Sequence, residues 1–380
     1  MLYGAYVMNI QQLIAKANKA HAANDISLAM GFLKQAGEAG DINAALDYAY
    51  YLSHDKPIES VQYLESLSCV ESPIVQYHKL LIAYFYDLIT DSNCVAKSLI
   101  DLGEKGVIEA YLVVLSYLEQ SSSEFSFISN KVKKIAPNIF SQLKLNELVN
   151  DKISESNKEK VAQSLETKLF ELLPIPTTLD ERLPINLFES MLSDFECNYL
   201  IVKFSGLLQP SMVVDPITGQ GRIDKIRTSY VALISPEHCD WLTRKIDKLV
   251  AKATETRFCQ GEALNLLRYV PGQEYKPHYD ALNRLQDVKT FEDGGQRTKT
   301  AIIYLNTVSE GGNTTFPKLD IRVSPIKGNM LVFNNSDDKG NILTNSYHAG
   351  ELTQKENKWL VTKWIREHKT NYGKFLYGNH

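Results

Sequence analysis

The chain has 380 residues, 44% of them hydrophobic and 23% charged, which is the ordinary composition of a soluble globular protein with room for two domains. The net charge of −4 gives no indication of bulk nucleic-acid binding. No apolar run approaches the roughly 20 residues of a membrane-spanning helix, and the N-terminus lacks a basic leader. We therefore expect a cytoplasmic protein with neither membrane nor nucleic acid as a partner.

The five cysteines show no paired spacing of the kind that zinc sites use, and their number is odd. We expect reduced thiols with structural roles, which agrees with a cytoplasmic location. They are Cys69, Cys94, Cys197, Cys239 and Cys259.

The N-terminal part is rich in Ala and Leu with helical periodicity, and it repeats itself. Residues 34–52 align with residues 100–118, which lie 66 positions later, and a degenerate copy fits residues 67–84. Half of that offset, about 33 residues, is close to the period of tetratricopeptide repeats, so residues 1–122 resemble such a domain. Stacked helical hairpins would offer a concave surface to a protein or peptide. A plain helical bundle is the alternative.

A polar, mostly helical segment follows, which we interpret as a linker over residues 123–178. The Leu-Pro-Ile-Pro sequence at 173–176 stops the last helix of this linker. Two further helices are expected at residues 188–203 and 236–253, where they would support a sheet from one side.

The last domain, residues 179–380, contains short β segments separated by turns. Pro271-Gly272 follows the run at 264–270, and a Gly-Gly pair at 311–312 follows the run at 299–306. Residues 321–333 read as strand, turn and strand. This spacing predicts a jelly roll. The fold class is therefore α+β, with an all-α helical-repeat domain followed by a double-stranded β-helix.

Three side chains of this domain form a candidate metal site. Strand side chains alternate between faces, so His278 and Asp280 would project to one side while Tyr279 points away. His348, from another strand, would complete the 2-His-1-carboxylate set of a non-haem Fe(II) oxygenase, which leaves positions open for a cosubstrate and dioxygen.

The same His-x-Asp spacing recurs at His238 and Asp240, but there the context differs. Ser235, Pro236 and Glu237 signal a helix start, and helical residues two apart do not share a face. We interpret this second copy as a solvated first turn.

Residues from about 180 to 368 resemble the prolyl 4-hydroxylase branch of the 2-oxoglutarate/Fe(II)-dependent dioxygenases. The motifs that carry the resemblance occur in the family's order: Arg227-Thr-Ser229, Arg268-Tyr-Val-Pro-Gly-Gln273, Pro277-His-Tyr-Asp280, Glu310-Gly-Gly312, Phe316-Pro317, Lys327-Gly328, Tyr347-His-Ala-Gly350 and Lys358-Trp359. The resemblance implies that Fe(II) is held by His278, Asp280 and His348. It also implies 2-oxoglutarate as cosubstrate, dioxygen as second substrate and ascorbate as a candidate reductant.

By the same resemblance, Lys358, ten positions past the last His, pairs with the distal carboxylate of 2-oxoglutarate. The strand pattern agrees, because Lys358, Leu360, Thr362 and Trp364 fall on one face and a buried lysine needs an anionic partner. A surface lysine near the strand start is the alternative.

Three aromatic residues are further candidates for cosubstrate binding. Tyr269 and Tyr304 match positions that resemble hydrogen-bond donors to 2-oxoglutarate, and Trp364 could line the pocket. Core packing is an alternative for all three. The role of Arg227 stays open between packing and contact with substrate.

Two more features bear on activity. Related halogenases replace the carboxylate ligand with a small residue, whereas Asp280 is present here, which favours hydroxylation. The long polar connection from Ala281 to Arg297 is predicted to be a lid over substrate.

We expect a hydroxylase that acts on prolyl residues of a protein or peptide, with the helical repeats as a docking module. Oxidative decarboxylation of 2-oxoglutarate to succinate would be coupled to C–H hydroxylation. The alternatives are a hydroxylase of a free amino acid or other small molecule, with the helices serving for dimerisation, and a non-catalytic helical-repeat adaptor.

Overall fold

The computed structural model describes residues 9–23, 25–145, 155–169, 173–214, 221–222 and 226–378. The chain forms two compact units. The first comprises Met1–Val114 with Glu155–Leu169, and the second comprises Leu115–Ser154 with Phe170–His380. Among the residues that are described, no helix combines the length and apolar character that crossing a membrane requires.

The sequence predicted domain boundaries at residues 122 and 178, and the two compact units divide the chain at other positions. The periodicity of a helix shows that it has a buried face but not which core that face joins. The ring of Phe125 lies 6.0 Å from that of Phe195 in the second unit. Conversely, the segment after residue 154 returns to the first unit, where Lys158 pairs with Glu104 at 2.7 Å. The three-part division stays a prediction about which segments fold independently.

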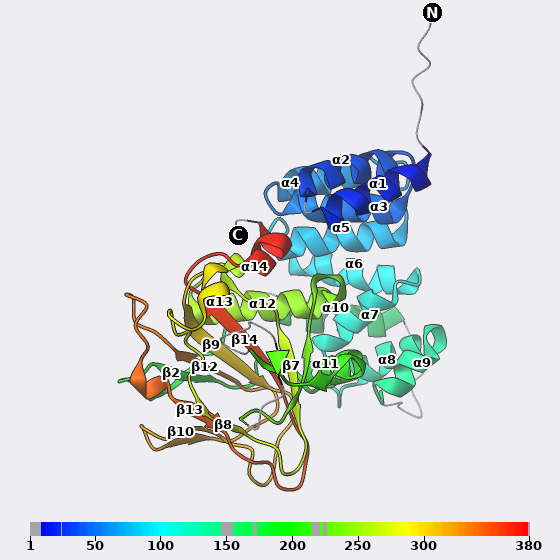
Figure 1. The fold of residues 1–380 in the computed structure, drawn as a ribbon. Coiled ribbons are helices and arrows are strands. Elements are labelled where there is room, and N and C mark those ends of the chain that lie inside the picture. The colour runs from blue at the N-terminus through cyan, green and yellow to red at the C-terminus, as the bar shows by residue number, and fades with distance from the viewer. Residues whose placement is uncertain are drawn as a thin grey trace, which may run out of the picture. The chain divides into compact units, whose positions relative to one another are not determined.

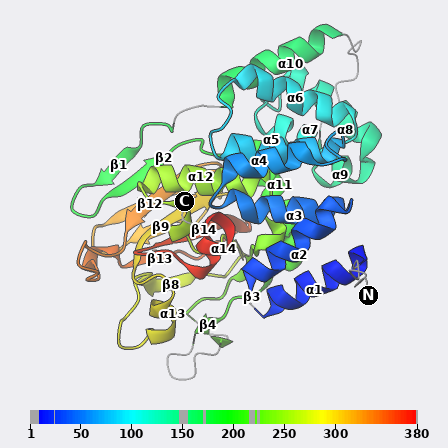
Figure 2. The same ribbon diagram turned by 90° about the horizontal axis from the view of Figure 1, so that it is seen from above.

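Helices of the first unit lie side by side in chain order from α1 to α6 (Figure 2). Aspartates cap several of them, and the Asp41 carboxylate accepts a hydrogen bond from the Ala44 amide. The helices are α1 (Ile10–Ala22), α2 (Ile26–Glu38), α3 (Ile42–Ser53), α4 (Pro57–Ser66), α5 (Pro73–Phe85), α6 (Ser92–Glu104) and α10 (Glu155–Lys168), with α7 (Ile108–Ser116) running across the division.

The two aligned sequence segments form matching hairpins, α2–α3 and α6–α7. Gly40 and Gly106 occupy the same place in the two turns, with φ of 107° and 95°. Each turn closes with the same pair of backbone bonds: Asp41 N to Ala36 O and Gly40 N to Gly37 O in the first, and their counterparts 66 residues later in the second. These are Schellman motifs, in which glycine avoids the strain of a positive φ. The repeat is therefore structural, while its assignment to the tetratricopeptide class stays a prediction.

The second unit contains two sheets that face each other, as in a jelly roll (Figure 1). The large sheet has the order β1-β2-β12-β9-β14-β7-β6-β3, the small one β11-β10-β13-β8, and β4 pairs only with β5. The strands are β1 (Thr177–Asp180), β2 (Ile185–Phe188), β3 (Gln209–Pro210), β4 (Val213–Val214), β5 (Gly221–Arg222), β6 (Tyr230–Leu233), β7 (Asn265–Tyr269), β8 (Tyr275–His278), β9 (Arg297–Tyr304), β10 (Thr314–Phe316), β11 (Ile321–Val323), β12 (Met330–Asn334), β13 (His348–Gly350) and β14 (Lys358–Arg366). The predicted fold class is confirmed.

Helices of this unit cover the outer face of the large sheet, and the small sheet covers its inner face (Figure 1). Strand β9 shows how one segment serves both cores: Ala301 and Ile303 pack with the helices, whereas Ile302 and Tyr304 pack between the sheets. The helices of this unit are α8 (Ser123–Ile135), α9 (Pro137–Gln142), α11 (Asp194–Phe204), α12 (Trp241–Thr254), α13 (Val288–Glu292) and α14 (Asn371–Tyr377), and α11 and α12 supply the helical residues of the outer core.

Both expected supporting helices exist, but they start later than residues 188 and 236. Phe188 instead ends β2, where it pairs with Met330, and α11 begins after a capping box formed by Ser193 and Glu196. Pro236 to His238 form a single 3-10 turn, and Asp240 caps α12. The His238–Asp240 copy is thus a helix entry, as predicted.

A pair of glycines that differ only in backbone conformation tests the repeat turns. A Cβ at Gly31 or at Gly40 would meet no atom within 4 Å, but only Gly40 has a positive φ. We expect Gly40→Ala to lower the free energy of unfolding by about 1–2 kcal/mol, and Gly31→Ala, inside α2, to raise it by about 0.5–1 kcal/mol. Urea denaturation followed by circular dichroism measures both, and equal shifts would contradict the turn geometry.

Candidate active site

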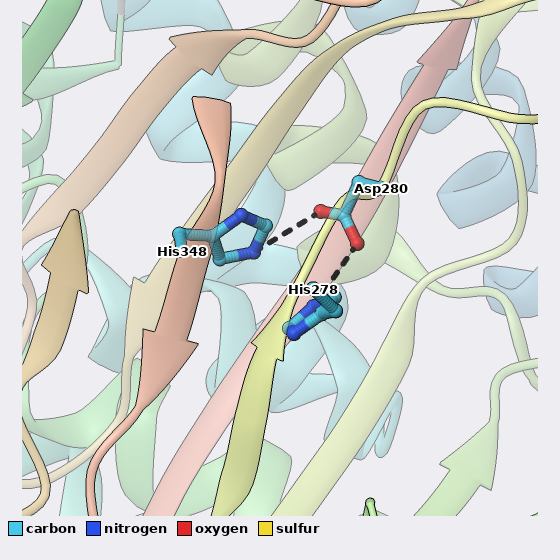
Figure 3. A group of neighbouring side chains, drawn as sticks. All are labelled: His278, Asp280 and His348. Atoms are coloured by element: carbon cyan, nitrogen blue, oxygen red, sulfur yellow. Dashed lines mark ion pairs between the residues drawn. The ribbon is translucent and has the colours of Figure 1, made fainter. Parts of the chain in front are cut away.

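His278 and His348 lie directly opposite each other on the antiparallel strands β8 and β13, and Asp280 follows β8. The imidazole centroids are 4.3 Å apart. Nε2 of His278 is 3.5 Å from Oδ1 of Asp280, and Nε2 of His348 is 3.6 Å from Oδ2 (Figure 3). Among the described residues this is the one group of three such side chains whose ligand atoms all lie within 4.8 Å of one another. The structure thus brings the three predicted residues together.

Strand alternation places the intervening tyrosine away from this group. The ring of Tyr279 lies 4.9 Å from that of Tyr347, and its hydroxyl accepts a hydrogen bond from Lys318 Nζ at 2.9 Å. Tyr347 precedes His348 as Tyr279 follows His278, so both tyrosines project from the opposite side of the small sheet.

Backbone carbonyls orient both imidazoles. Nδ1 of His278 donates to the Lys276 carbonyl, and Nδ1 of His348 donates to the Ser346 carbonyl, each at 2.8 Å. A carbonyl only accepts, so Nδ1 carries a hydrogen in both rings, and in the neutral form of either ring Nε2 presents its lone pair toward Asp280. A metal-binding histidine usually donates a hydrogen bond from its other ring nitrogen, often to a backbone carbonyl.

Charge in the group also suits a cation. Burial favours the neutral form of Asp280, but the facing imidazoles of His348 and His278 hold the pKa of its carboxyl well below the usual value. Burial, together with His278, lowers the pKa of His348 to about 4. Near neutral pH the group therefore offers one carboxylate and a neutral imidazole at His348, which are donors that a divalent transition metal accepts.

Lys358 begins β14 and is only 2% exposed, so it is not a surface lysine. Burial lowers the pKa of its ammonium to about 7, with a small opposing effect from Glu351. Within the described residues its Nζ has no hydrogen-bond or ion-pair partner. Two glycines leave space beside it, since a Cβ at Gly312 would lie 3.4 Å from its Cδ and one at Gly350 3.9 Å from its Nζ. The site thus holds a buried lysine whose Nζ is free of partners among the described residues and is flanked by two glycines.

The 2OG-Fe(II) oxygenase superfamily matches residues 264–366 of this chain. Among curated relatives, prolyl 4-hydroxylase 5 of Arabidopsis thaliana is 32% identical over 48% of this chain and 68% of its own length. Prolyl 4-hydroxylase 1 of the same plant is 33% identical over 49% of this chain and 70% of its own length. The chain belongs to the 2-oxoglutarate/Fe(II) oxygenases of the prolyl 4-hydroxylase type. It is a dioxygenase that uses Fe(II) and 2-oxoglutarate.

Among solved structures, the viral collagen prolyl hydroxylase of Paramecium Bursaria Chlorella virus-1, in its 2OG complex, is similar over 49% of this chain and 96% of its own. The identity is 26% and the TM-score is 0.39. A prolyl-4-hydroxylase from Pseudomonas putida is 21% identical over 48% of this chain and 92% of its own, with a TM-score of 0.35.

One cavity is lined both by Lys358 and by the candidate metal-binding group, which consists of His278, Asp280 and His348. Its lining includes all three members of the group and, from β14, Lys358, Leu360, Thr362 and Trp364. The predicted face of the final strand is confirmed.

The two tyrosine candidates occupy different positions. Tyr269 lies opposite Lys358 on β7, lines the cavity and places its ring centroid 5.6 Å from Lys358 Nζ. Tyr304 is fully buried behind the lining, and its hydroxyl donates to Thr314 Oγ1 at 2.8 Å. The ring of Trp364 lies 3.9 Å from the guanidinium of Arg297, and its indole nitrogen is buried without a hydrogen-bond partner.

Several cavity residues were not predicted. Thr314 and Tyr275 line it, and the Tyr275 ring stacks on that of His278 at 3.5 Å between centroids. Arg227, whose role was left open, also lines the cavity and holds its guanidinium 5.1 Å from the Tyr275 ring. Thr300 donates a hydrogen bond to Asp280 Oδ2 at 2.7 Å. Of the residues that were not candidates, Thr300 could have been found from the sequence, because it shares the parity of Ile302 and Tyr304 on β9.

The connection between Asp280 and β9 is partly ordered by its own helix α13. Arg366 of β14 donates to the carbonyls of Thr290 and Asp293, and Gln296 Nε2 donates to the Leu282 carbonyl at 3.0 Å. Leu285 at its tip is 90% exposed. The base of the connection is therefore anchored, and a lid function stays a prediction for its tip.

Removing the buried charge at Lys358 is expected to stabilise the protein in the absence of 2-oxoglutarate. With a pKa of about 7 in place of 10.5, the folded protein either holds an unpaired buried cation or releases a proton that the unfolded chain keeps. Lys358→Met should raise the free energy of unfolding by about 2–4 kcal/mol at pH 6, and the gain should shrink as pH rises from 7 toward 10.

Urea denaturation of the two proteins between pH 6 and pH 9 measures this difference. The exposed Lys276 provides the control, because Lys276→Met removes a solvated charge and should change little. A Lys358→Met protein that is less stable at pH 6 would show that the ammonium has a partner in the folded state.

Proposed function

We propose that this oxygenase hydroxylates prolyl residues of a protein or peptide, with Fe(II) bound by His278, Asp280 and His348. Lys358 would bind the distal carboxylate of 2-oxoglutarate. The observation that carries the proposal is the presence, in one cavity, of three clustered potential ligand atoms and a buried ammonium that has no partner among the described residues.

The donor set suits Fe(II), and the buried Lys358 ammonium that lines the same cavity suits a carboxylate of the cosubstrate. When bound, Fe(II) and 2-oxoglutarate supply the oxidising chemistry, in which 2-oxoglutarate becomes succinate as a substrate C–H bond is hydroxylated. The chain contributes orientation, since Nε2 of each histidine is aimed by a backbone carbonyl. Leu267, Ile302 and Leu360 line the cavity with apolar surface, which limits the water that competes for polar contacts.

Lys358 would recognise cosubstrate by charge. Its ammonium lies in an apolar setting where an ion pair with a carboxylate is far stronger than in water. Tyr269 is the better placed of the two phenols for a hydrogen bond to the same carboxylate, because it lines the cavity and Tyr304 does not. Tyr304 would act through Thr314, whose hydroxyl it contacts. Trp364 would close the cavity on the β14 side.

Prolyl residues are proposed as the target because the curated relatives named above are prolyl 4-hydroxylases. We further propose that the helical hairpins of the first unit dock the protein substrate, since stacked hairpins present a surface for peptides. A cytoplasmic location is supported by five free cysteines. Ascorbate is proposed as the reductant on the family resemblance alone.

Succinate release from 2-oxoglutarate tests the metal group directly. Iron-loaded protein should form succinate, and His278→Ala and Asp280→Ala should each reduce the rate at least 100-fold, because each removes one of three protein ligands. His238→Ala is the matched control and should retain full activity, since His238 lies in the helix-entry turn. Equal rates in all four proteins would eliminate the assignment.

Removal of the first unit tests docking. The division of the chain indicates a variant that starts at Leu115 and replaces Glu155–Leu169 by a Gly-Ser linker of equal length, so that α8 and α9 are kept. We expect this variant to form succinate without substrate at the normal rate and to lose hydroxylation of proteins in a cell extract, measured by mass spectrometry. Unchanged hydroxylation of extract proteins would contradict docking, and unchanged turnover of a free amino acid would favour the small-molecule alternative.

A further inference from the structure

Two buried residues outside the metal-binding group form a hydrogen-bonded chain that ends on Asp280. Asn335 Nδ2 donates to Thr300 Oγ1 at 2.8 Å, and Thr300 Oγ1 donates to Asp280 Oδ2 at 2.7 Å. Asn335 and Thr300 are fully buried and Asp280 is 6% exposed. Because all three side chains are buried, their geometry is set by protein contacts.

The direction of each hydrogen bond follows from the chemistry of the groups. An ionised carboxylate only accepts, so the single hydroxyl hydrogen of Thr300 must point at Asp280. Thr300 Oγ1 can then only accept from Asn335, which places the amide nitrogen of Asn335, and not its oxygen, toward Thr300. The chain therefore has one sense, from Asn335 through Thr300 to the carboxylate.

The buried side-chain amide of Asn335 lowers the stability of the folded protein. Its Oδ1 is buried and has no hydrogen-bond partner in the part of the chain that the structure describes, and a buried carbonyl without a partner destabilises a folded protein. The backbone around it is well anchored, because Asn335 N donates to the Thr298 carbonyl and Leu343 N donates to the Asn335 carbonyl. An apolar side chain of the same shape would avoid the unpaired oxygen, so packing alone does not account for an amide at this position.

We propose that Thr300 and Asn335 are positioning residues that hold Asp280 as a one-oxygen ligand of the metal. This inference rests on the proposed function. The hydroxyl of Thr300 occupies a lone pair of Oδ2, which disfavours binding of both carboxylate oxygens to one ion. A carboxylate bound through two oxygens would take up a coordination position, whereas the cosubstrate and dioxygen need the open face of the 2-His-1-carboxylate set. Asn335 keeps the Thr300 hydrogen directed at Asp280 by occupying its acceptor side.

Valine and serine at position 300 separate positioning from packing. Thr300→Val keeps the shape but removes the hydroxyl, and Thr300→Ser keeps the hydroxyl. Under anaerobic conditions, we expect Thr300→Val to weaken Fe(II) binding about 10- to 100-fold in titration calorimetry. At saturating Fe(II) it should also weaken 2-oxoglutarate binding, followed by the visible charge-transfer absorption of the chelate. Thr300→Ser should stay within about threefold of the unaltered protein on both measurements.

Controls on the same strand and at the far end of the chain complete the design. Thr298→Val removes a β9 hydroxyl that donates to the Ile365 carbonyl at 3.3 Å, and it should change neither affinity. Asn335→Leu removes the amide while Thr300 remains, and it should weaken Fe(II) binding by a smaller factor than Thr300→Val. The melting temperature of metal-free Asn335→Leu should equal or exceed that of the unaltered protein, which a purely structural role would not allow.

The outcomes are separable. If the unaltered protein fails to bind Fe(II), the proposed function is overturned together with this inference. If it binds Fe(II) and Thr300→Val matches it in both affinities, only the inference is overturned. Should Thr300→Val fail to fold, Asn335→Leu decides the matter, because an unchanged Fe(II) affinity with a lowered melting temperature would assign the amide to structure alone.

Discussion

The register between β8 and β13 is the constraint on which the site depends. It places His278 directly opposite His348, so two imidazoles from segments about 70 residues apart share one face of the small sheet. Asp280 then needs only to follow β8 by two residues to reach both rings. A shift of one residue would exchange the imidazoles with Tyr279 and Tyr347, which already contact each other on the other face.

In the second unit, the two faces of the large sheet have different roles: one stabilises the fold and the other forms the candidate active site. The outer face of the large sheet packs aliphatic side chains against α11 and α12, and this core contains no member of the metal-binding group. The inner face carries the polar groups that oppose folding: a buried ammonium at Lys358, a buried carboxylate at Asp280 and an amide at Asn335 with an unpaired oxygen. The fold can accommodate these polar groups because apolar burial on the outer face of the large sheet stabilises it.

Local pattern was sufficient to predict what depends on strand alternation and short motifs. The clustering of His278, Asp280 and His348 and the shared face of Lys358 and Trp364 both follow from spacing that a single sequence displays. Asn335 could not be predicted in this way, because its contact with Thr300 spans 35 residues and depends on the pairing of β12 with β9. The grouping of α8 with the second unit was hidden for a similar reason: amphipathic periodicity shows that a helix has a buried face and not which core buries it.

Strand β9 depends most on correct strand pairing, because its alternate residues pack into the cores on the two faces of the large sheet. Thr300 reaches Asp280 while Ala301 and Ile303 pack with the helices. A single inserted residue within this strand would therefore turn Thr300 toward the helices and an aliphatic side chain toward Asp280. The active site and the core beneath the helices would be disrupted together. Insertions at the exposed tip near Leu285 leave the alternation of β9 side chains unchanged. Within β9 itself, only insertions or deletions of two residues preserve that alternation.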